Sequence, residues 1–195
     1  KGLSFVKMLG SGGKQGFGIF PNFGLYGLLC VWEDEQSRQS FFKDSEIFQN
    51  LQSQSEKHQT IFLQTLNAHG KWDGKEPFSH KKQKAQAQER IAVITRARIK
   101  WSKVWKFWTS VAPASRKMYA HPGLIFSIGI GELPLIQQAT FSIWESMEAM
   151  TDYAYKSPQH KKVIQMTQKI NWYKEELFAR FLIKGIDGEG IIHFT

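Results

Sequence analysis

The chain contains the same segment twice, and this internal repeat limits the folds open to it. The copies begin at Trp32 (WEDEQSRQSFFKDSEIFQ) and at Trp144 (WESMEAMTDYAYKSPQHK). In each copy an aromatic residue follows the tryptophan by nine positions, and a serine follows it by thirteen. The sixteenth position is Phe48 in the first copy and His160 in the second. The repeat predicts one structural unit used twice, with a histidine in the second unit only.

Hydrophobic periodicity in the second half predicts the element order β-α-β-β-α-β, which is the ferredoxin-like arrangement. Alternating β-branched residues predict the first strand, and apolar residues at helical spacing predict a helix that Pro113 ends or kinks. The expected strands are 91–99, 123–131, 138–144 and 177–183, and the expected helices are 101–111 and, with a break, 147–170.

The first half shows only the later part of this order, with strands over 3–9, 24–32 and 61–66 and a helix over 36–56. We therefore expect an α+β protein of two tandem ferredoxin-like halves that pack their sheets face to face, as in a dimeric α+β barrel within one chain. The first half lacks its leading β-α unit, for which roughly 35 residues would be needed. The expected division is a first half over 1–74, a basic linker over 75–90, a second half over 91–185 and a tail over 186–195.

Composition excludes several classes of protein. A hydrophobic content of 42% with seven tryptophans excludes general disorder, and no segment reaches the roughly 20 apolar residues of a membrane-spanning helix. The single cysteine, Cys30, excludes an internal disulfide and a cysteine-based zinc site. Much of the net charge of +9 lies in 75–90, which is typical of a solvated linker and is also compatible with attraction to anionic lipid headgroups. We expect a cytoplasmic protein that contacts the inner membrane surface peripherally and binds no nucleic acid, since its aromatic residues lie in amphipathic segments.

His160 is the candidate metal ligand. Ser157 and Pro158 form a helix start, so His160 lies in the first turn and shares a face with Val163 and Ile164. The helix dipole at this end disfavours a protonated ring, and a neutral imidazole is the form that binds a metal. No second ligand shares its helical face, which argues against zinc and is compatible with haem, whose macrocycle supplies the other ligands. An ordinary core histidine is the alternative.

A haem pocket also requires an apolar slot and cationic partners for the propionates. The candidates for the slot are Phe126, Phe141, Trp144, Trp172 and Phe178, and those for the cations are Arg96, Arg98, Arg116, Lys117 and Arg180. Ordinary core packing for the aromatic residues and solvation for the basic ones are the alternatives.

Several sequence blocks together resemble the spheroidene monooxygenase family, the bacterial carotenoid 2-ketolases. They are FVKMLGSG, PNFGLYGLLCVW, GKWDGKEPF, ITRARI, GLIFSIGIGELP, QATFSIW and WYKEELFARF, and they cover 3–181 in family order. The resemblance implies oxygen-dependent oxidation of an acyclic carotenoid at the carbon next to its end, with haem as cofactor and an external electron donor. The segment 186–195 has no counterpart in the family.

A more distant likeness to the ferredoxin-like, haem-degrading monooxygenases concerns the helix that carries the haem ligand. There only His160 matches the proximal ligand, which implies one haem per chain. Other readings remain open: a different haem enzyme on this fold, such as an aldoxime dehydratase or a peroxidase, a non-catalytic haem or lipid carrier, or a cofactor-free oxygenase.

Overall fold

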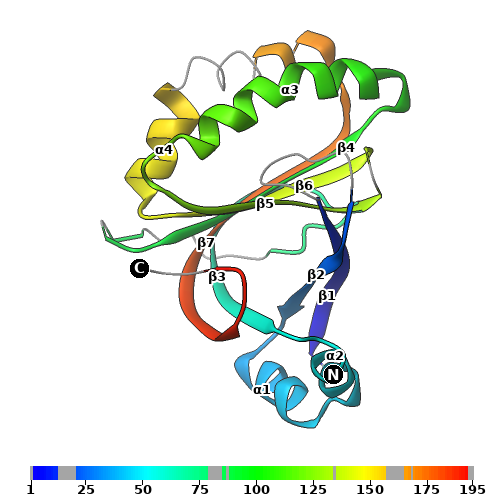
Figure 1. Cartoon of the computed structure of the whole chain (residues 1–195), viewed down its shortest axis with the longest axis vertical. Coiled ribbons are helices and arrows are strands. Elements are labelled where there is room, and N and C mark those ends of the chain that lie inside the picture. Colours follow the sequence, from blue (N-terminus) through cyan, green and yellow to red (C-terminus); the bar gives the residue numbers. More distant parts are fainter. Residues whose placement is uncertain are drawn as a thin grey trace.

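The computed structural model describes residues 2–12, 21–78, 85–86, 88–133, 135–156, 165–167 and 169–192, with the side chains of 111–117 left out. Seven strands and four helices follow one another along the chain in this description (Figure 1). Their order is β1 (Leu3–Gly12), β2 (Pro21–Trp32), α1 (Glu35–Asp44), α2 (Glu46–Ser53), β3 (His58–Gly70), β4 (Ile91–Ile99), a 3₁₀ turn (Trp101–Lys103), α3 (Val104–Tyr119), β5 (Leu124–Leu133), β6 (Gln137–Trp144), α4 (Met147–Lys156) and β7 (Tyr173–Glu189).

All seven strands belong to one curled antiparallel sheet with the order β2-β1-β5-β6-β4-β7-β3 (Figure 1). The antiparallel α+β class is confirmed, whereas the face-to-face packing of two half-sheets stays a prediction, because the described strands of both halves belong to one sheet. Strands of the two halves are joined edge to edge, β1 to β5 and β3 to β7, so that backbone groups at those edges are paired with each other.

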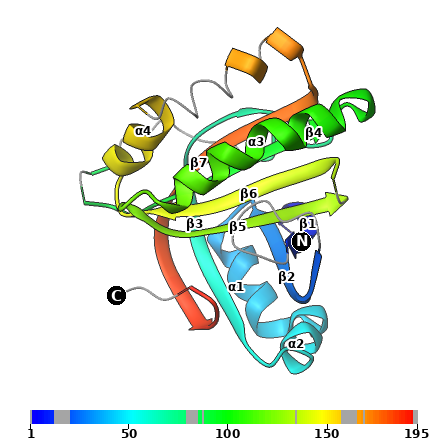
Figure 2. The same ribbon diagram turned by 45° about the horizontal axis from the view of Figure 1, so that its top comes forward.

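The sheet has two different faces, because successive side chains of a strand point to opposite sides. On the concave face, Phe5, Ile94, Ile143 and Phe181 belong to one buried cluster that draws on both halves of the chain. We call the other side the helix-covered face, since α3 and α4 lie over it (Figure 2). A second buried cluster lies there, with strand residues that include Trp144 packed with residues of α3 and α4.

The second half has the predicted element order β-α-β-β-α-β. The expected end of the first helix at Pro113 is wrong, because α3 continues to Tyr119. Proline removes one backbone donor from a helix. Phe107 before it and Met118 after it are both buried, so apolar packing holds the helix on either side.

The first half contains two helices where the sequence predicted one. Ser45 interrupts the expected helix because its backbone is extended and its side chain accepts a hydrogen bond from the Phe48 N–H, at 3.4 Å, as the N-cap of α2. The repeated aromatic spacing is reproduced as a contact. The ring centroids of Trp32 and Phe41 lie 5.0 Å apart, and those of Trp144 and Tyr153 lie 5.3 Å apart.

The predicted linker and tail both contribute residues to the sheet and its core. Phe78, within the predicted linker, is buried in the concave cluster and contacts Phe181 edge to face. β7 runs past residue 185 to Glu189, and Ile186 pairs with Ile61 of β3. Among the described residues, no helix is long and apolar enough to cross a lipid bilayer.

Replacing the helix cap tests the break between α1 and α2. Ser45→Ala removes the acceptor for the Phe48 N–H and should lower the free energy of unfolding by about 1 kcal/mol. Ser45→Asp keeps an acceptor and should unfold close to the wild type. Urea unfolding of the three proteins measures the difference, and equal stability of Ser45→Ala and wild type would contradict the cap.

Candidate functional site

The sheet separates the predicted site residues onto two faces. Trp144 and Phe178 pack in the cluster under α3 and α4, and Arg180 shares the side of β7 that carries Phe178. Phe141 packs in the concave cluster. Arg96 shares the concave side of β4 with Ile94, and so does Arg98 by the same alternation. A single planar ligand cannot contact both groups, because the sheet lies between them.

On the helix-covered face, Trp144, Tyr153 and His121 form an aromatic group. The rings of Trp144 and Tyr153 stack, and His121 meets the Trp144 ring edge to face with centroids 5.4 Å apart. Burial, with the neighbouring Tyr119 phenol, raises the pKa of Tyr153 to about 12, so its hydroxyl is protonated at neutral pH. The indole of Trp144 donates to the Ser142 hydroxyl at 3.0 Å. The group combines aromatic rings with the hydroxyls of Tyr153 and Ser142.

The orientation of His121 is fixed from both sides of its ring. Its Nδ1 accepts a hydrogen bond from the Gly123 N–H at 3.1 Å, which leaves the proton of a neutral ring on Nε2. That atom lies 3.6 Å from the Asp152 carboxylate. Lys156, with a smaller contribution from His121, holds the pKa of Asp152 below its usual range. Asp152 is therefore an anionic partner for the imidazole at the margin of the aromatic group.

Phe178 and Arg180 lie further across the same face. The Arg180 guanidinium lies 5.0 Å from the centre of the Phe178 ring, and the His69 ring lies 5.4 Å from the same ring. Nε of Arg180 is buried without a hydrogen-bond partner among the described residues. This part of the face therefore combines the aromatic ring of Phe178 with the guanidinium of Arg180, whose Nε–H donates to no described residue.

Arg96, on the concave face, is bound by the protein itself. Its side chain is 1% exposed and pairs with Glu175, with Asp73 at 3.2 Å and with Glu132 at 3.5 Å. Lys7 of β1 also pairs with Asp73 and Glu132. We call these five residues the Arg96 network. The three carboxylates of the network pair with the Arg96 guanidinium. The sequence predicted this guanidinium as a partner for a haem propionate.

Of the two remaining predicted aromatic residues, Phe126 packs against the concave cluster and Trp172 lies elsewhere. It is fully buried beneath the start of α3, where it packs with Ile99 and meets Phe107 edge to face at 5.5 Å. Its indole donates to the Thr167 hydroxyl at 3.1 Å. Trp172 belongs to a third cluster, separate from that of Trp144 and Phe178.

His160 lies outside the described residues, as do the side chains of Arg116 and Lys117. The part of the chain that the structure describes contains no group of three His, Cys, Asp or Glu side chains that could hold a metal ion.

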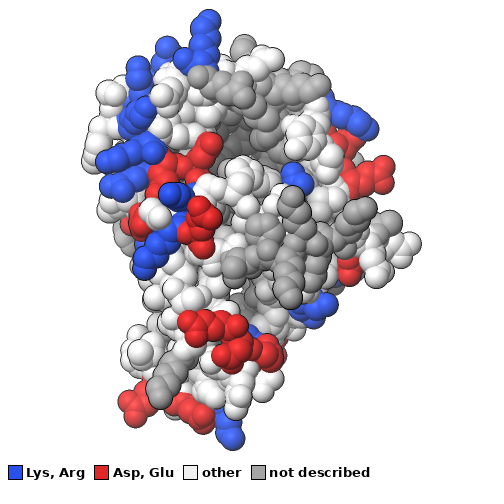
Figure 3. Space-filling model, turned by 180° about the vertical axis from the view of Figure 1, so that it is seen from behind, with Lys and Arg blue, Asp and Glu red and all other residues white. Residues whose placement is uncertain are grey.

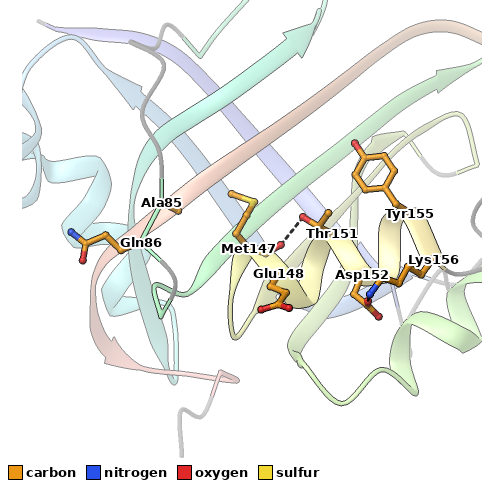
Figure 4. A pocket seen from close by; sticks show the side chains of 8 residues that line it. All are labelled: Ala85, Gln86, Met147, Glu148, Thr151, Asp152, Tyr155 and Lys156. Carbon is orange, nitrogen blue, oxygen red and sulfur yellow. Dashed lines mark hydrogen bonds and ion pairs between the residues drawn. The ribbon is translucent and has the colours of Figure 1, made fainter.

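A surface hollow of about 400 Å³ lies beside α4 (Figure 4). Met147, Thr151 and Tyr155 line it from the helix, and Ala85 and Gln86 line it from the opposite side. No predicted site residue that the structure describes lines this hollow. Asp152 connects the hollow to the aromatic group, because it lines the hollow and its carboxylate pairs with His121.

Sequence reasoning missed the contribution of His121, Asp152 and Tyr153. The Trp-to-aromatic spacing of the repeat was the available signal for Tyr153, because it recurs as a ring contact in both halves. His121 carried no comparable signal, since its turn precedes β5 whereas its partners lie on β6 and α4. Only the folded chain brings them together.

The fold and the helix-covered face define the class of protein. It is an antiparallel α+β protein in which two helices cover a sheet face that carries aromatic and polar side chains.

No family model matches the chain. The chain is 39% identical over 186 residues to the spheroidene monooxygenase of Cereibacter sphaeroides, 32% over 187 residues to that of Rhodobacter capsulatus and 31% over 187 residues to that of Rubrivivax gelatinosus. The matches cover 95%, 95% and 96% of this chain and 57%, 78% and 71% of those proteins. The chain belongs to the spheroidene monooxygenase family, as the sequence blocks predicted.

Similarity to solved structures is distant. A proposed monooxygenase of Fusobacterium nucleatum matches with a TM-score of 0.49 and 12% identity, covering 100% of this chain and 82% of its own. A second, from Lactobacillus acidophilus, matches with a TM-score of 0.47 and 13% identity, covering 97% and 82%. At these values the likeness carries no argument about function.

The Arg96 network makes stability depend on pH. Burial raises the pKa of Glu175, but hydrogen bonds from the Gly74 N–H, Arg96 and the Asp73 N–H outweigh it and hold this pKa below its usual range. A lowered carboxyl pKa stabilises the fold above the unfolded-state value of about 4.3, and this contribution is lost as the pH falls through the folded-state pKa. Glu175→Gln should therefore unfold more easily at pH 7, and its deficit relative to wild type should shrink toward pH 3.

Urea unfolding of both proteins between pH 7 and pH 3 measures this effect. Glu176→Gln is the matched control, because Glu176 is the exposed neighbour on the same strand. A deficit of Glu175→Gln that stays constant over the whole range would show that the carboxylate contributes no linked stability.

Proposed function

We propose that this chain provides the substrate-oxidising part of an oxygen-dependent monooxygenase that acts on an acyclic carotenoid. The observation that carries the proposal is the identity of 39%, 32% and 31% to three spheroidene monooxygenases over nearly the whole chain. The chain spans 57% of the Cereibacter sphaeroides protein, little more than half its length. The activity of the whole enzyme is part of the proposal for that reason.

The helix-covered face is the proposed location of the reaction. Phe178 is half-buried, and Thr95, directly opposite it on β4, is exposed although its chain neighbours are buried. A long polyene can therefore reach this part of the sheet without displacing the core. Its apolar body would pack on Phe178 and exclude water from the reacting carbon, in the manner of most binding sites for apolar ligands.

Oxidation of a CH₂ group to a ketone takes two rounds of the same reaction. In each round one oxygen atom of O₂ enters a C–H bond, and the other leaves as water with two electrons and two protons from a donor. The first round gives a secondary alcohol, and the second gives a geminal diol that loses water to form the ketone. The chain's own residues have to hold the same carbon in place through both rounds.

A pair of matched substitutions tests the face on which the substrate binds. Phe178→Leu, on the helix-covered face, should lower the rate of carotenoid oxidation by about three- to tenfold, since an aromatic contact contributes about 0.5–1.5 kcal/mol. Phe141→Leu, on the concave face, should leave the rate near that of wild type. The assay is chromatography of ketone formed from an acyclic carotenoid with O₂ and reductant, and the reverse order of the two rates would contradict the assignment.

We also propose haem as the cofactor, with His160 as the residue that would hold its iron; bound haem would supply the activation of oxygen. The described residues fit this group on one face only. The half-buried Phe178 offers an aromatic surface there, and Arg180 offers a buried Nε donor for a propionate, which has no hydrogen-bond partner among the described residues. Arg96 does not fit, because it is on the opposite face and three carboxylates pair with it.

The internal repeat supports His160 as the ligand. Its counterpart Phe48 follows a serine N-cap and packs on Phe41, with ring centroids 5.6 Å apart. Phe41 is in turn the counterpart of Tyr153 in the aromatic group. In the first half, the position equivalent to His160 thus belongs to the helix turn next to the aromatic pair.

The visible spectrum of haem-loaded protein tests the ligand without reference to turnover. His160→Ala should shift or abolish the Soret band of the bound haem, because a single protein ligand is lost. His58→Ala, an exposed histidine at the start of β3, should leave the spectrum unchanged. A His160→Ala spectrum identical to that of wild type would rule out this ligand, and failure of the wild type to take up haem would rule out the cofactor.

We infer further that the two halves are versions of one ferredoxin-like unit. The second half has the strand order β5-β6-β4-β7, and β1, β2 and β3 take the places of β5, β6 and β7 in the first. Counterparts of β4 and α3 are not among the described residues. The counterpart of β4 would lie between β2 and β3, which are the two ends of the curled sheet, and would close it.

The proposal involves two partners. An external protein would deliver the electrons, and an anionic lipid surface would be the source of the apolar substrate. Basic side chains extend along one margin of the molecule beside a group of mixed charges (Figure 3), and the net charge of +9 favours contact with such a surface.

A further inference from the structure

The helix-covered face carries buried hydroxyl groups that pair with no group in the described part of the chain. The side chains of Ser127 on β5 and Thr140 on β6 are 7% and 8% exposed, and neither hydroxyl has a hydrogen-bond partner among the described residues. A buried hydroxyl without a partner destabilises a fold by about 1–3 kcal/mol, so most such groups are paired in native proteins. We therefore expect a ligand that forms hydrogen bonds with these hydroxyl groups.

Thr140 borders an accessible part of this face. In the register of the sheet it lies opposite Thr95 of β4 on one side and opposite Gly129 of β5 on the other. Directly opposed side chains of an antiparallel pair have Cβ atoms about 5 Å apart. Thr95 is exposed, while Ile94 and Arg96 beside it in the chain are buried. A ligand that reaches Thr95 from solvent thus comes within reach of the Thr140 hydroxyl.

The same row continues onto β7. Thr95 lies opposite Phe178, so Thr140, Thr95 and Phe178 form one line across β6, β4 and β7, on the face that α3 overlies (Figure 2). We call these three residues the threonine row. Arg180, two residues beyond Phe178, brings its unpartnered Nε to the edge of this row. The row combines an aromatic surface for an apolar chain with hydroxyl groups for a single polar atom.

The chemistry of the row selects its ligand. A hydroxyl group both donates and accepts, so it pairs well with an alcohol, which does the same. A hydrocarbon offers neither partner and leaves the buried Thr140 hydroxyl unsatisfied. Ser142 is already occupied by the Trp144 indole, and so contributes less to such a ligand. An apolar molecule with one hydroxyl group is the class that fits.

We propose that the threonine row holds the hydroxyl of the singly oxidised carotenoid, so that this intermediate stays bound for its second oxidation. The inference rests on the proposed function and adds the residues that retain the intermediate. In the first round O₂, two electrons and two protons from the donor convert CH₂ to CHOH and one water, and the new oxygen pairs with Thr140 and Thr95. The second round converts CHOH to the geminal diol and one water, again with O₂, two electrons and two protons, and loss of a further water from the diol gives the ketone.

Product analysis with threonine-to-valine variants tests the proposal. Thr140→Val and Thr95→Val keep the side-chain shape but remove the hydroxyl, so both should release more alcohol and raise the alcohol-to-ketone ratio about five- to tenfold, the effect of one lost hydrogen bond. Thr60→Val on β3 is the matched control and should keep the wild-type ratio. Thr140→Val should be at least as stable as wild type in urea, because it removes a buried hydroxyl that has no partner among the residues that the structure describes.

Binding of two probes separates this inference from the proposed function. The probes are an acyclic carotenoid alcohol and the acyclic carotenoid hydrocarbon of the same length. The wild type should bind the alcohol more tightly, and Thr140→Val should lose about five- to tenfold in affinity for the alcohol only. If the wild type makes no product but shows this selectivity, the proposed function fails and the threonine row stands as a binding site. Equal affinities of wild type for both probes, or an unchanged product ratio in Thr140→Val, would overturn the inference.

Discussion

A buried guanidinium links the parts of this fold that are far apart in sequence. Arg96 extends from β4 into the concave side of the sheet, where an unpaired charge would be strongly destabilising. Its three carboxylates come from β5, from β7 and from the turn after β3, and Lys7 brings in β1. The network therefore fixes strands of both halves relative to one another. It lies on the concave side, away from the helix-covered face on which the substrate is proposed to bind.

The internal repeat was the best guide that the sequence offered to the fold. It predicted matched helices after Trp32 and Trp144, and the matched ring contacts confirm that spacing. It did not reveal that Ser45 divides one expected helix into two, because a serine within an amphipathic segment is compatible with either outcome until its cap is formed. Nor did it predict the joining of the halves into a single sheet, since edge pairing is set by backbone contacts between distant segments.

The sequence predicted which types of residue form the candidate site. It did not predict which face of the sheet carries each of them. Aromatic and basic residues of the second half were identified, yet alternation along β4, β6 and β7 places Phe141, Arg96 and Arg98 on one face and Trp144, Phe178 and Arg180 on the other. Which side carries the helices cannot be read from alternation when both faces are buried. The sequence could not show that the hydroxyls of Ser127 and Thr140 lack hydrogen-bond partners among the described residues. Whether a hydroxyl is paired depends on the groups that the fold places around it.

The central claim is that the helix-covered face binds the end of an acyclic carotenoid. A crystal structure of the protein with such a molecule bound tests this claim most directly. The account predicts that the carotenoid end lies between the sheet and α3, in contact with Phe178 and Thr95. A carotenoid bound instead on the concave face, against Phe141 and Ile143, would contradict it.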